Sequence, residues 1–293
     1  MITLSLLTPD TAHAFEHLTF ASFRPLLSEA SNGQVVALGA TRRERPVGLA
    51  LALKDPSTDS AELLSLFVAQ GERRQGVGRA LLARLEAELT AARLRSVQAV
   101  YTNGKASTPA LESLLSGAGW SEPVVRQHFF RADLARLQAA PWIQETRAPK
   151  GYEIFPWTEL SARDEADLRR AQQEEPWFPE LLSPFQDADL FEAAGSVGLR
   201  HQGRVVGWMI AHRIAPNLLR YSHLFVAKEH QSFGRGVALV AAAVRGVQPA
   251  GSWEAICSVP REFPTWLKFV RRRIAPYTKS SYASLGIEKQ LLP

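Results

Sequence analysis

Residues 66–82 read Leu66-Phe-Val-Ala-Gln-Gly-Glu-Arg73-Arg-Gln-Gly76-Val-Gly78-Arg-Ala-Leu-Leu82. An apolar run typical of a strand leads into a polar loop with glycines, and the loop leads into a segment with helical apolar spacing. Successive backbone N–H groups in such a loop, together with the positive end of the helix dipole, bind anions. Glycine lets the main chain approach the anion because it has no side chain. This stretch therefore predicts a phosphate-binding turn between a strand and a helix.

The same block recurs 158 residues later in the chain. Leu224-Phe-Val-Ala227 repeats Leu66-Phe-Val-Ala69, and Gly234 and Gly236 repeat Gly76 and Gly78. Upstream, Arg204-Val-Val-Gly207 resembles Arg45-Pro-Val-Gly48 at an offset of 159. A fixed offset over a strand, a loop and a helix indicates two diverged copies of one domain.

The join between the copies is marked by Pro141, Pro149 and Gly151, which interrupt periodic structure. We therefore predict a first domain over residues 1–140, a linker over 141–151 and a second domain over 152–293. The boundary is placed near Lys150.

Strands and helices alternate within the first copy. Predicted strands cover residues 2–8, 35–40, 47–53, 62–68, 96–102 and 127–132, and predicted helices cover 11–23, 78–92 and 109–116. The helix over 11–23 rests on the apolar spacing of Ala14, Leu18 and Ala21. This alternation predicts an α/β class with a mixed sheet.

Composition favours a globular protein of the cytoplasm. The 293 residues are 46% hydrophobic and 22% charged, and no apolar run is long enough to span a bilayer. The start, Met1 to Pro9, has no basic leader and is expected to form the first strand. The single cysteine, Cys257, excludes an internal disulfide and a thiolate zinc cage, so no metal site is predicted.

The net charge of +5 permits an acidic partner without requiring one. The densest basic run, Arg271-Arg272-Arg273, suits the last turn of a helix, where cations complement the dipole. No aromatic-basic motif accompanies it, so a nucleic-acid partner is not favoured. A homodimer is compatible with the sequence.

Two common phosphate loops are excluded by the residues present. The Walker A pattern needs Gly-Lys-Ser/Thr, and the dinucleotide fingerprint needs a third glycine where Leu81 stands. The remaining pattern is Arg/Gln-x-x-Gly-x-Gly/Ala, present as Arg73-x-x-Gly76-x-Gly78 and Gln231-x-x-Gly234-x-Gly236. This pattern resembles the coenzyme A pyrophosphate loop of the GNAT superfamily of N-acetyltransferases. The resemblance covers both halves and implies two consecutive GNAT acyl-CoA N-acyltransferase folds.

The resemblance also implies where acetyl-CoA binds. Backbone groups at the end of the strand would hold the pantetheine arm, and the loop and helix start would hold the pyrophosphate. The coenzyme-binding residues it implies are Phe67, Val68, Arg73, Arg74, Gln75, Gly76, Val77, Gly78, Arg79, Ala80 and Asn103. Their counterparts in the second copy are Phe225, Val226, Gln231, Ser232, Phe233, Gly234, Arg235 and Gly236, with the bulky Phe233 expected inside the cradle.

A general base is needed because an amine with a pKa near 10 is mostly protonated at neutral pH. Glu62 lies six residues before Val68, where several relatives keep a catalytic glutamate. Strand alternation predicts that Glu62, Leu64, Leu66 and Val68 share one face. The alternative is a glutamate at the strand edge that faces water.

The chain departs from the family pattern at the position of the general acid. Many relatives of the GNAT superfamily carry a tyrosine acid where this chain has Leu115. Tyr101 and Asn103, at the end of the preceding strand, are the nearby substitutes, and Tyr101 is the candidate acid. The alternative is departure of the thiolate without a dedicated acid. In the second copy Arg220 replaces Glu62. His223 is predicted on the strand face opposite Arg220 and Leu224, as a packed core residue rather than a base.

These features predict an acetyl-CoA-dependent N-acetyltransferase that acts on a primary amine of a small molecule or peptide. The first copy would carry the chemistry, and segments 20–29 and 176–185 would contact the acceptor. The competing hypothesis is a non-catalytic module that senses coenzyme A or mediates an interaction.

Overall fold

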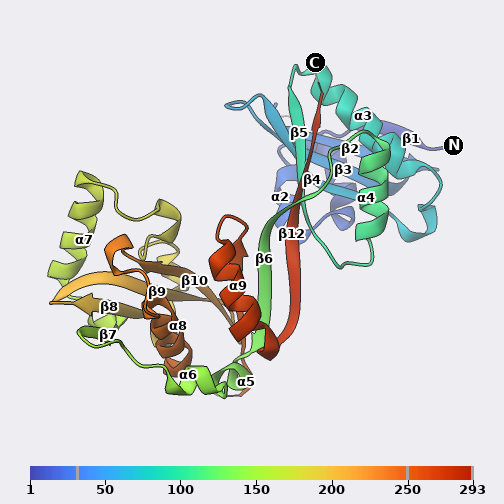
Figure 1. The fold of residues 1–293 in the computed structure, drawn as a ribbon. Coiled ribbons are helices and arrows are strands. Elements are labelled where there is room, and N and C mark those ends of the chain that lie inside the picture. The colour runs from blue at the N-terminus through green and yellow to red at the C-terminus, as the bar shows by residue number, and fades with distance from the viewer. Residues whose placement is uncertain (31–32, 249–250, 292–293) are drawn as a thin grey trace. The chain divides into compact units, whose positions relative to one another are not determined.

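The computed structural model describes residues 1–30, 33–248 and 251–291. The chain forms two compact units (Figure 1): a first unit of Met1–Arg126 with Ala283–Pro293, and a second unit of Gln127–Tyr282. Each unit combines a mixed sheet with helices on both faces, so the predicted α/β class is confirmed.

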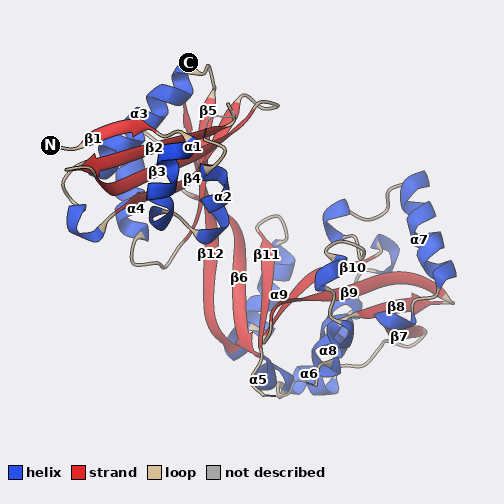
Figure 2. Cartoon of the chain, turned by 180° about the vertical axis from the view of Figure 1, so that it is seen from behind, coloured by secondary structure: helices blue, strands red, loops and turns tan. Residues whose placement is uncertain are grey.

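The sheet of the first unit has the order β1-β2-β3-β4-β5-β12. Among the strand pairs of this order that the structure describes, β4–β5 is parallel and the others are antiparallel. Helices α3 and α4 cover one face, and α1 and α2 cover the other, as Figures 1 and 2 show from opposite sides. The elements are β1 (Thr3–Leu6), α1 (Pro9–Ala12), α2 (Arg24–Leu27), β2 (Val35–Arg42), β3 (Arg45–Asp55), β4 (Ser60–Val68), α3 (Val77–Ala91), β5 (Ser96–Thr102), α4 (Thr108–Gly117) and β12 (Thr278–Gln290).

The second unit has the strand order β6-β11-β10-β9-β8-β7, and here β10–β11 is the parallel pair. Helices α5, α6, α8 and α9 pack on one face, and α7 packs on the other. The elements are β6 (Val124–Asp133), α5 (Leu134–Gln138), α6 (Pro141–Glu145), β7 (Tyr152–Pro156), α7 (Ala162–Glu174), β8 (Val197–His201), β9 (Arg204–Ala215), β10 (Leu218–Val226), α8 (Arg235–Gly246), β11 (Glu254–Pro260) and α9 (Pro264–Arg273).

The division between the units differs from the one placed near Lys150. Residues 127–133 of β6 pair with β11, and residues 284–290 of β12 pair with β5. The final strand of each repeat therefore completes the sheet of the other. The segment 141–151, expected as a linker, begins with α6, whose Trp142 and Ile143 are buried in the core of the second unit.

The single helix predicted over residues 11–23 is wrong. The structure has α1, then a 3-10 helix over His13–Leu18, then an extended Thr19 and a short turn over Ala21–Phe23. The buried residues Ala12, Phe15 and Leu18 recur every third position, which is the period of a 3-10 helix rather than an α-helix.

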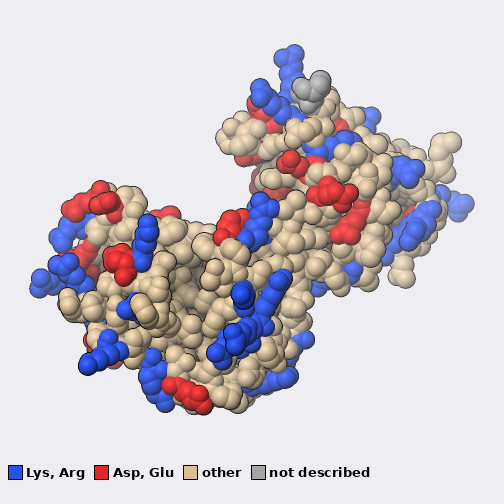
Figure 3. All heavy atoms as spheres, viewed as in Figure 1, with Lys and Arg blue, Asp and Glu red and all other residues tan. Residues whose placement is uncertain are grey.

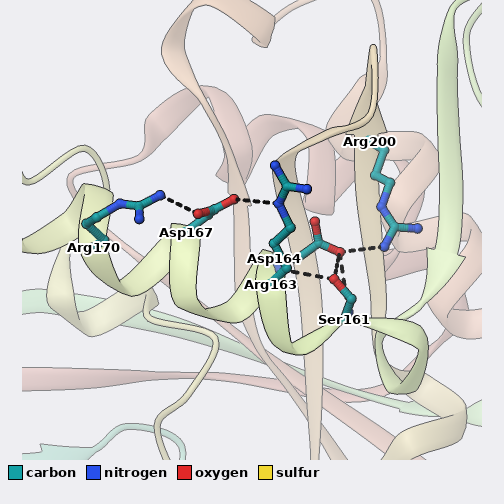
Figure 4. Close-up of polar contacts among 6 residues, drawn as sticks. All are labelled: Ser161, Arg163, Asp164, Asp167, Arg170 and Arg200. Atoms are coloured by element: carbon teal, nitrogen blue, oxygen red, sulfur yellow. Dashed lines mark hydrogen bonds and ion pairs between the residues drawn. The ribbon is translucent and has the colours of Figure 1, made fainter.

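Helix α7 begins at a capping box that also fixes it to the sheet (Figure 4). Ser161 Oγ accepts a hydrogen bond from Asp164 N at 3.0 Å, and Asp164 accepts one from Ser161 Oγ at 2.9 Å. Arg200 of β8 donates to the same carboxylate at 2.9 Å. Arg200, in the β8–β9 hairpin, thus joins the sheet of the second unit to the start of α7.

We expect Ile287→Ala in β12 to destabilise the first unit although the residue lies near the end of the chain. Ile287 is 4% exposed in the core beneath α3, and such truncations cost about 2–5 kcal/mol. Hydrogen exchange of β5 amides at residues 97–102 should accelerate. Glu288→Ala, at the exposed neighbouring position, is the control; equal exchange in both variants would contradict the assignment of β12 to this unit.

Candidate functional site

Strands β4 and β5 separate part-way along their length. They pair in parallel only from Ser60 with Ser96 to Leu63 with Ala99, although they continue to Val68 and Thr102. Ala69 N donates to Val47 O at 2.9 Å, so strand alternation directs the backbone of Leu66 and Val68 toward the gap and that of Phe67 toward β3. The end of β4 therefore offers main-chain hydrogen-bonding groups to a ligand.

A β-bulge lies where the two strands separate. Leu63 pairs with Ala52 and Ser65 with Leu51, so Leu64 is the extra residue. Such a bulge shifts every following side chain to the other face. The prediction that Glu62 shares a face with Leu66 and Val68 is wrong for this reason. Leu66 and Val68 pack beneath α3, whereas Glu62 pairs with Leu53 on the face of α1 and α2.

Glu62 remains close to the gap, since its pair with Gln98 is the last but one of the β4–β5 ladder. Its side chain is half-buried, and among the described residues it has no hydrogen bond or ion pair. A carboxylate without a partner is free to accept a proton. Its role as a base stays a prediction.

The loop after β4 presents the start of α3 to solvent. Gly76 caps the helix in the left-handed region at φ 81°, and a Cβ there would meet no atom within 4 Å. Ala80 N already donates to Gly76 O at 3.0 Å. The four preceding N–H groups, of residues 76–79, therefore have no partner within the helix. Val77 contributes only its backbone, because its side chain is buried in the core.

Arginines surround this helix start. Arg73, Arg74 and Arg79 are exposed, and within the described residues Arg74 and Arg79 form no ion pair or hydrogen bond. Arg73 instead donates from Nε to Val68 O at 2.9 Å, and Gln231 donates to Val226 O at 2.9 Å in the second unit. The first motif position thus takes Arg or Gln because it joins the loop to the strand end. Free N–H groups and cations together fit a diphosphate.

The candidate acid and the nearby asparagine have protein partners. Tyr101 donates its hydroxyl to Glu112 at 2.9 Å, and burial together with this bond raises the pKa of the phenol. Asn103 Oδ1 accepts a hydrogen bond from Ala283 N at 2.7 Å, which closes the β5–β12 pairing. Leu115 is fully buried. The proton of Tyr101 is therefore directed to Glu112, a partner that the sequence reasoning missed.

The second unit repeats this backbone with a different loop. Strands β10 and β11 pair only from Leu218 to Tyr221, and Ser222 is the bulged residue, 158 positions after Leu64. Gly234 caps α8 at φ 78°. Ser232 and Phe233 are also left-handed, at φ 92° and 48°. The Phe233 side chain is 87% exposed.

Comparison with known proteins agrees with this geometry. The model of the Acetyltransferase (GNAT) family matches residues 2–114 and 162–258, which together are more than half of the chain. The chain belongs to the GNAT family. No curated protein matches it in sequence.

Three solved structures share the GNAT fold over nearly the whole chain. A tandem GNAT protein from the clavulanic acid biosynthesis pathway has 16% identity and a TM-score of 0.59 and covers 100% of this chain and 99% of its own. A GCN5-related N-acetyltransferase from Sphaerobacter thermophilus has 14% identity and a TM-score of 0.56, with 100% and 96% covered. A glucosamine N-acetyltransferase region of a fungal β-N-acetylglucosaminidase has 15% identity and a TM-score of 0.57, with 98% and 38% covered.

The bulge in β10 also places the charged residues of the second GNAT unit. Arg220 pairs with His212 and His223 with Ile210, so both face the side of α7. His223 was predicted opposite Arg220, which is wrong, and opposite Leu224, which is confirmed. Arg220 is bound to Asp187 at 2.6 Å. The position that holds Glu62 in the first unit therefore carries a paired cation here.

Two further segments singled out in the sequence, residues 176–185 and 271–273, lie in different environments. Trp177 and Phe178 pack against Trp208 and Phe225, so these aromatics belong to the core. Arg271, Arg272 and Arg273 form the exposed last turn of α9, as predicted, and Figure 3 shows basic side chains gathered over that helix. Among the described residues, no helix is long and apolar enough to cross a membrane.

We expect the stability of the second unit to fall in mild acid because of His223. Burial, and then the neighbouring His212, lower the pKa of His223 to about 4. Below pH 6.5, the ordinary pKa of a histidine, His223 is protonated in the unfolded chain but stays neutral in the folded unit. The free energy of unfolding therefore falls by at most about 1.4 kcal/mol per pH unit, down to about pH 4.

Thermal denaturation at pH 7.5 and pH 5 measures this loss. The difference in Tm should shrink in His223→Gln and stay unchanged in His17→Gln, which removes an exposed histidine. An undiminished difference in His223→Gln would show that His223 is not responsible.

Proposed function

We propose that the first unit is an acetyl-CoA-dependent N-acetyltransferase that acts on a primary amine of a small molecule or peptide. One observation carries the proposal. The unpaired end of β4 leads directly into a glycine-capped helix start that has free N–H groups and unpartnered arginines. Membership in the GNAT family supports it.

In this proposal, different residues of the first unit bind the coenzyme and transfer the proton. The N–H groups of residues 76–79, with Arg74 and Arg79, would hold the diphosphate, and the backbone of Leu66 and Val68 would hold the pantetheine arm. Bound acetyl-CoA supplies an acyl thioester. The amine nitrogen forms a bond to the acyl carbon, the carbon–sulfur bond breaks, and Glu62 accepts the amine proton directly or through water.

The sulfur leaves as a thiolate in this scheme. A thiol has an unperturbed pKa of about 8.5, so departure does not demand a dedicated acid. Tyr101 is a poor donor because its proton is held by Glu112. The second unit, whose loop carries Arg235 but no counterpart of Arg73 and Arg74, is a diverged copy to which we assign no part of the reaction.

The alternative is a unit that binds coenzyme A without turnover, which the buried Leu115 and the engaged Tyr101 favour. A thiol-release assay with a panel of amines separates the two. The panel includes glucosamine, because one structural neighbour is a glucosamine N-acetyltransferase region. Release that depends on an amine selects the enzyme, and tight binding without release selects the sensor.

We expect Gly78→Glu to abolish coenzyme binding and activity, and the matched Gly236→Glu to spare most of both. Neither glycine needs a left-handed φ, and a Cβ at Gly78 meets Leu114 at an ordinary 3.4 Å. The loss should therefore come from a carboxylate placed in phosphate space and not from strain. Calorimetric titration of folded variants with coenzyme A measures it. Loss in Gly236→Glu alone would assign the site to the second unit.

We expect Glu62→Gln to lower kcat and leave the affinity for coenzyme A unchanged. Glutamine keeps the size of the side chain but cannot accept the proton, and general bases contribute about a hundredfold to ten-thousandfold. The pH–rate profile should also lose its acidic limb. Near-normal turnover with an unchanged profile would make Glu62 structural.

A further inference from the structure

We infer that Arg42 is a positioning residue for the coenzyme loop of the first unit. Its guanidinium holds Glu72 and Gln75, the two residues that flank the turn before Gly76, so that the N–H groups of α3 are presented in one arrangement. The inference rests on the proposed function of that loop.

The contacts join the β2–β3 hairpin to both sides of the turn. Arg42 Nε lies 2.8 Å from Glu72 Oε2, and Arg42 Nη2 donates to Gln75 Oε1 at 2.9 Å. Gln75 Nε2 in turn donates to Gly71 O at 3.0 Å. The Nη2 contact is a hydrogen bond, whereas the Nε contact is an ion pair without hydrogen-bond geometry. A planar guanidinium can make both contacts at once because its nitrogens hold fixed relative positions.

The ion pair is shielded from water. The facing atoms, Arg42 Nε and Glu72 Oε2, are both excluded from solvent, and the two side chains are 31% and 22% exposed. Removing one member of such a pair leaves an uncompensated charge out of water, whereas an exposed pair contributes little. The contact is therefore costly to break, as a positioning contact must be.

The backbone between the two held residues is strained. Arg74 adopts a left-handed φ of 62°, which is unfavourable for a residue other than glycine. Such conformations persist where the surroundings fix them, and they cluster at binding sites. Arg42 fixes Glu72 on one side of Arg74 and Gln75 on the other. The free Arg74 side chain thereby stays beside the helix start.

We call the contacts of Arg42 with Glu72 and Gln75 the Arg42 clamp. Among the described residues, the second unit has no such contacts at the equivalent positions. His201 pairs with Arg204 at the head of its hairpin as Arg42 pairs with Arg45, and His230 and Phe233 lie 158 positions after Glu72 and Gln75. The ring centroids of His201 and His230 are 5.1 Å apart, and the structure describes no ion pair between these two residues. The neighbouring Arg200 is bound to Asp164 instead (Figure 4). The clamp therefore distinguishes the loop to which we assign the coenzyme.

A clamp of this kind acts on affinity. If its loss lets the loop adopt the binding conformation about one tenth of the time, the apparent Kd for coenzyme A rises about tenfold. The chemical step is unaffected, because Arg42 lies on the diphosphate side of the loop and contacts no residue of the proposed proton transfer. KM should rise and kcat should stay unchanged.

The test compares Arg42→Gln with Arg45→Gln. Arg45 is the strand partner of Arg42 in the β2–β3 hairpin, and its exposed side chain has no ion pair or hydrogen bond among the described residues. The control therefore removes the same charge from the same hairpin and leaves the loop untouched. Calorimetry with coenzyme A should show Kd about tenfold higher in Arg42→Gln than in Arg45→Gln. Arg42→Lys keeps the charge but has a single donor nitrogen, so it should show a smaller loss than Arg42→Gln.

Hydrogen exchange of residues 72–79 without ligand gives an independent reading. It should accelerate in Arg42→Gln and in Glu72→Gln, and not in Arg45→Gln. Equal Kd values for the two arginine variants, or a fall in kcat at constant Kd, would overturn the inference, as would unchanged exchange in Arg42→Gln. Failure of the proposed function looks different, since the unmodified protein and Gly78→Glu would then bind coenzyme A equally.

Discussion

The parallel ladder between β4 and β5 ends at Leu63 and Ala99, and the candidate site depends on that ending. The extra residue Leu64 sits in β4 at the same point, where a bulge bends its strand and increases the local twist. Beyond the bulge, β4 remains hydrogen-bonded to β3 on one side, and on the other side its backbone N–H and C=O groups are not paired with β5. Because α3 starts only nine residues after Val68, its free N–H groups lie at the open end of the gap. The second unit repeats the arrangement at Ser222, so the bulge and the gap belong to the repeat itself.

Features that depend on neighbouring residues could be predicted from the sequence. The buried leucines of α3 follow the apolar spacing that predicted this helix. The left-handed conformation of Gly76, which was not predicted, is also a local feature of the helix start. The bulge could not be predicted, because residues 60–68 contain no glycine or proline to mark it and its position is set by pairing with β3. Glu62 therefore had to be placed from the structure. The exchange of final strands is equally hidden, since the choice between two edge strands depends on the whole sheet and not on the segment that pairs.

The same distinction applies to the site residues. Arg73 and Gln231 are interchangeable in the motif because each needs only one N–H donor for the strand-end carbonyl. Tyr101 and Asn103 are different, because their polar atoms are bound to Glu112 and to Ala283, and the second of these partners is 180 residues away. Sequence spacing could suggest that both face the gap. It could not reveal that each already has a partner.

The two units also separate what the backbone provides from what side chains provide. Both units have the bulge, the separated strands and the glycine cap. These are features of the backbone, and they are compatible with many different side chains. The units differ in the groups that give a loop its charge and rigidity: three arginines and a shielded ion pair surround the first cradle, whereas histidine rings and an exposed phenylalanine surround the second. An anion binds more tightly where aligned N–H groups are supported by cations. A shared GNAT backbone is therefore compatible with one unit that binds the coenzyme and another that does not, and the side chains around each helix start make the difference.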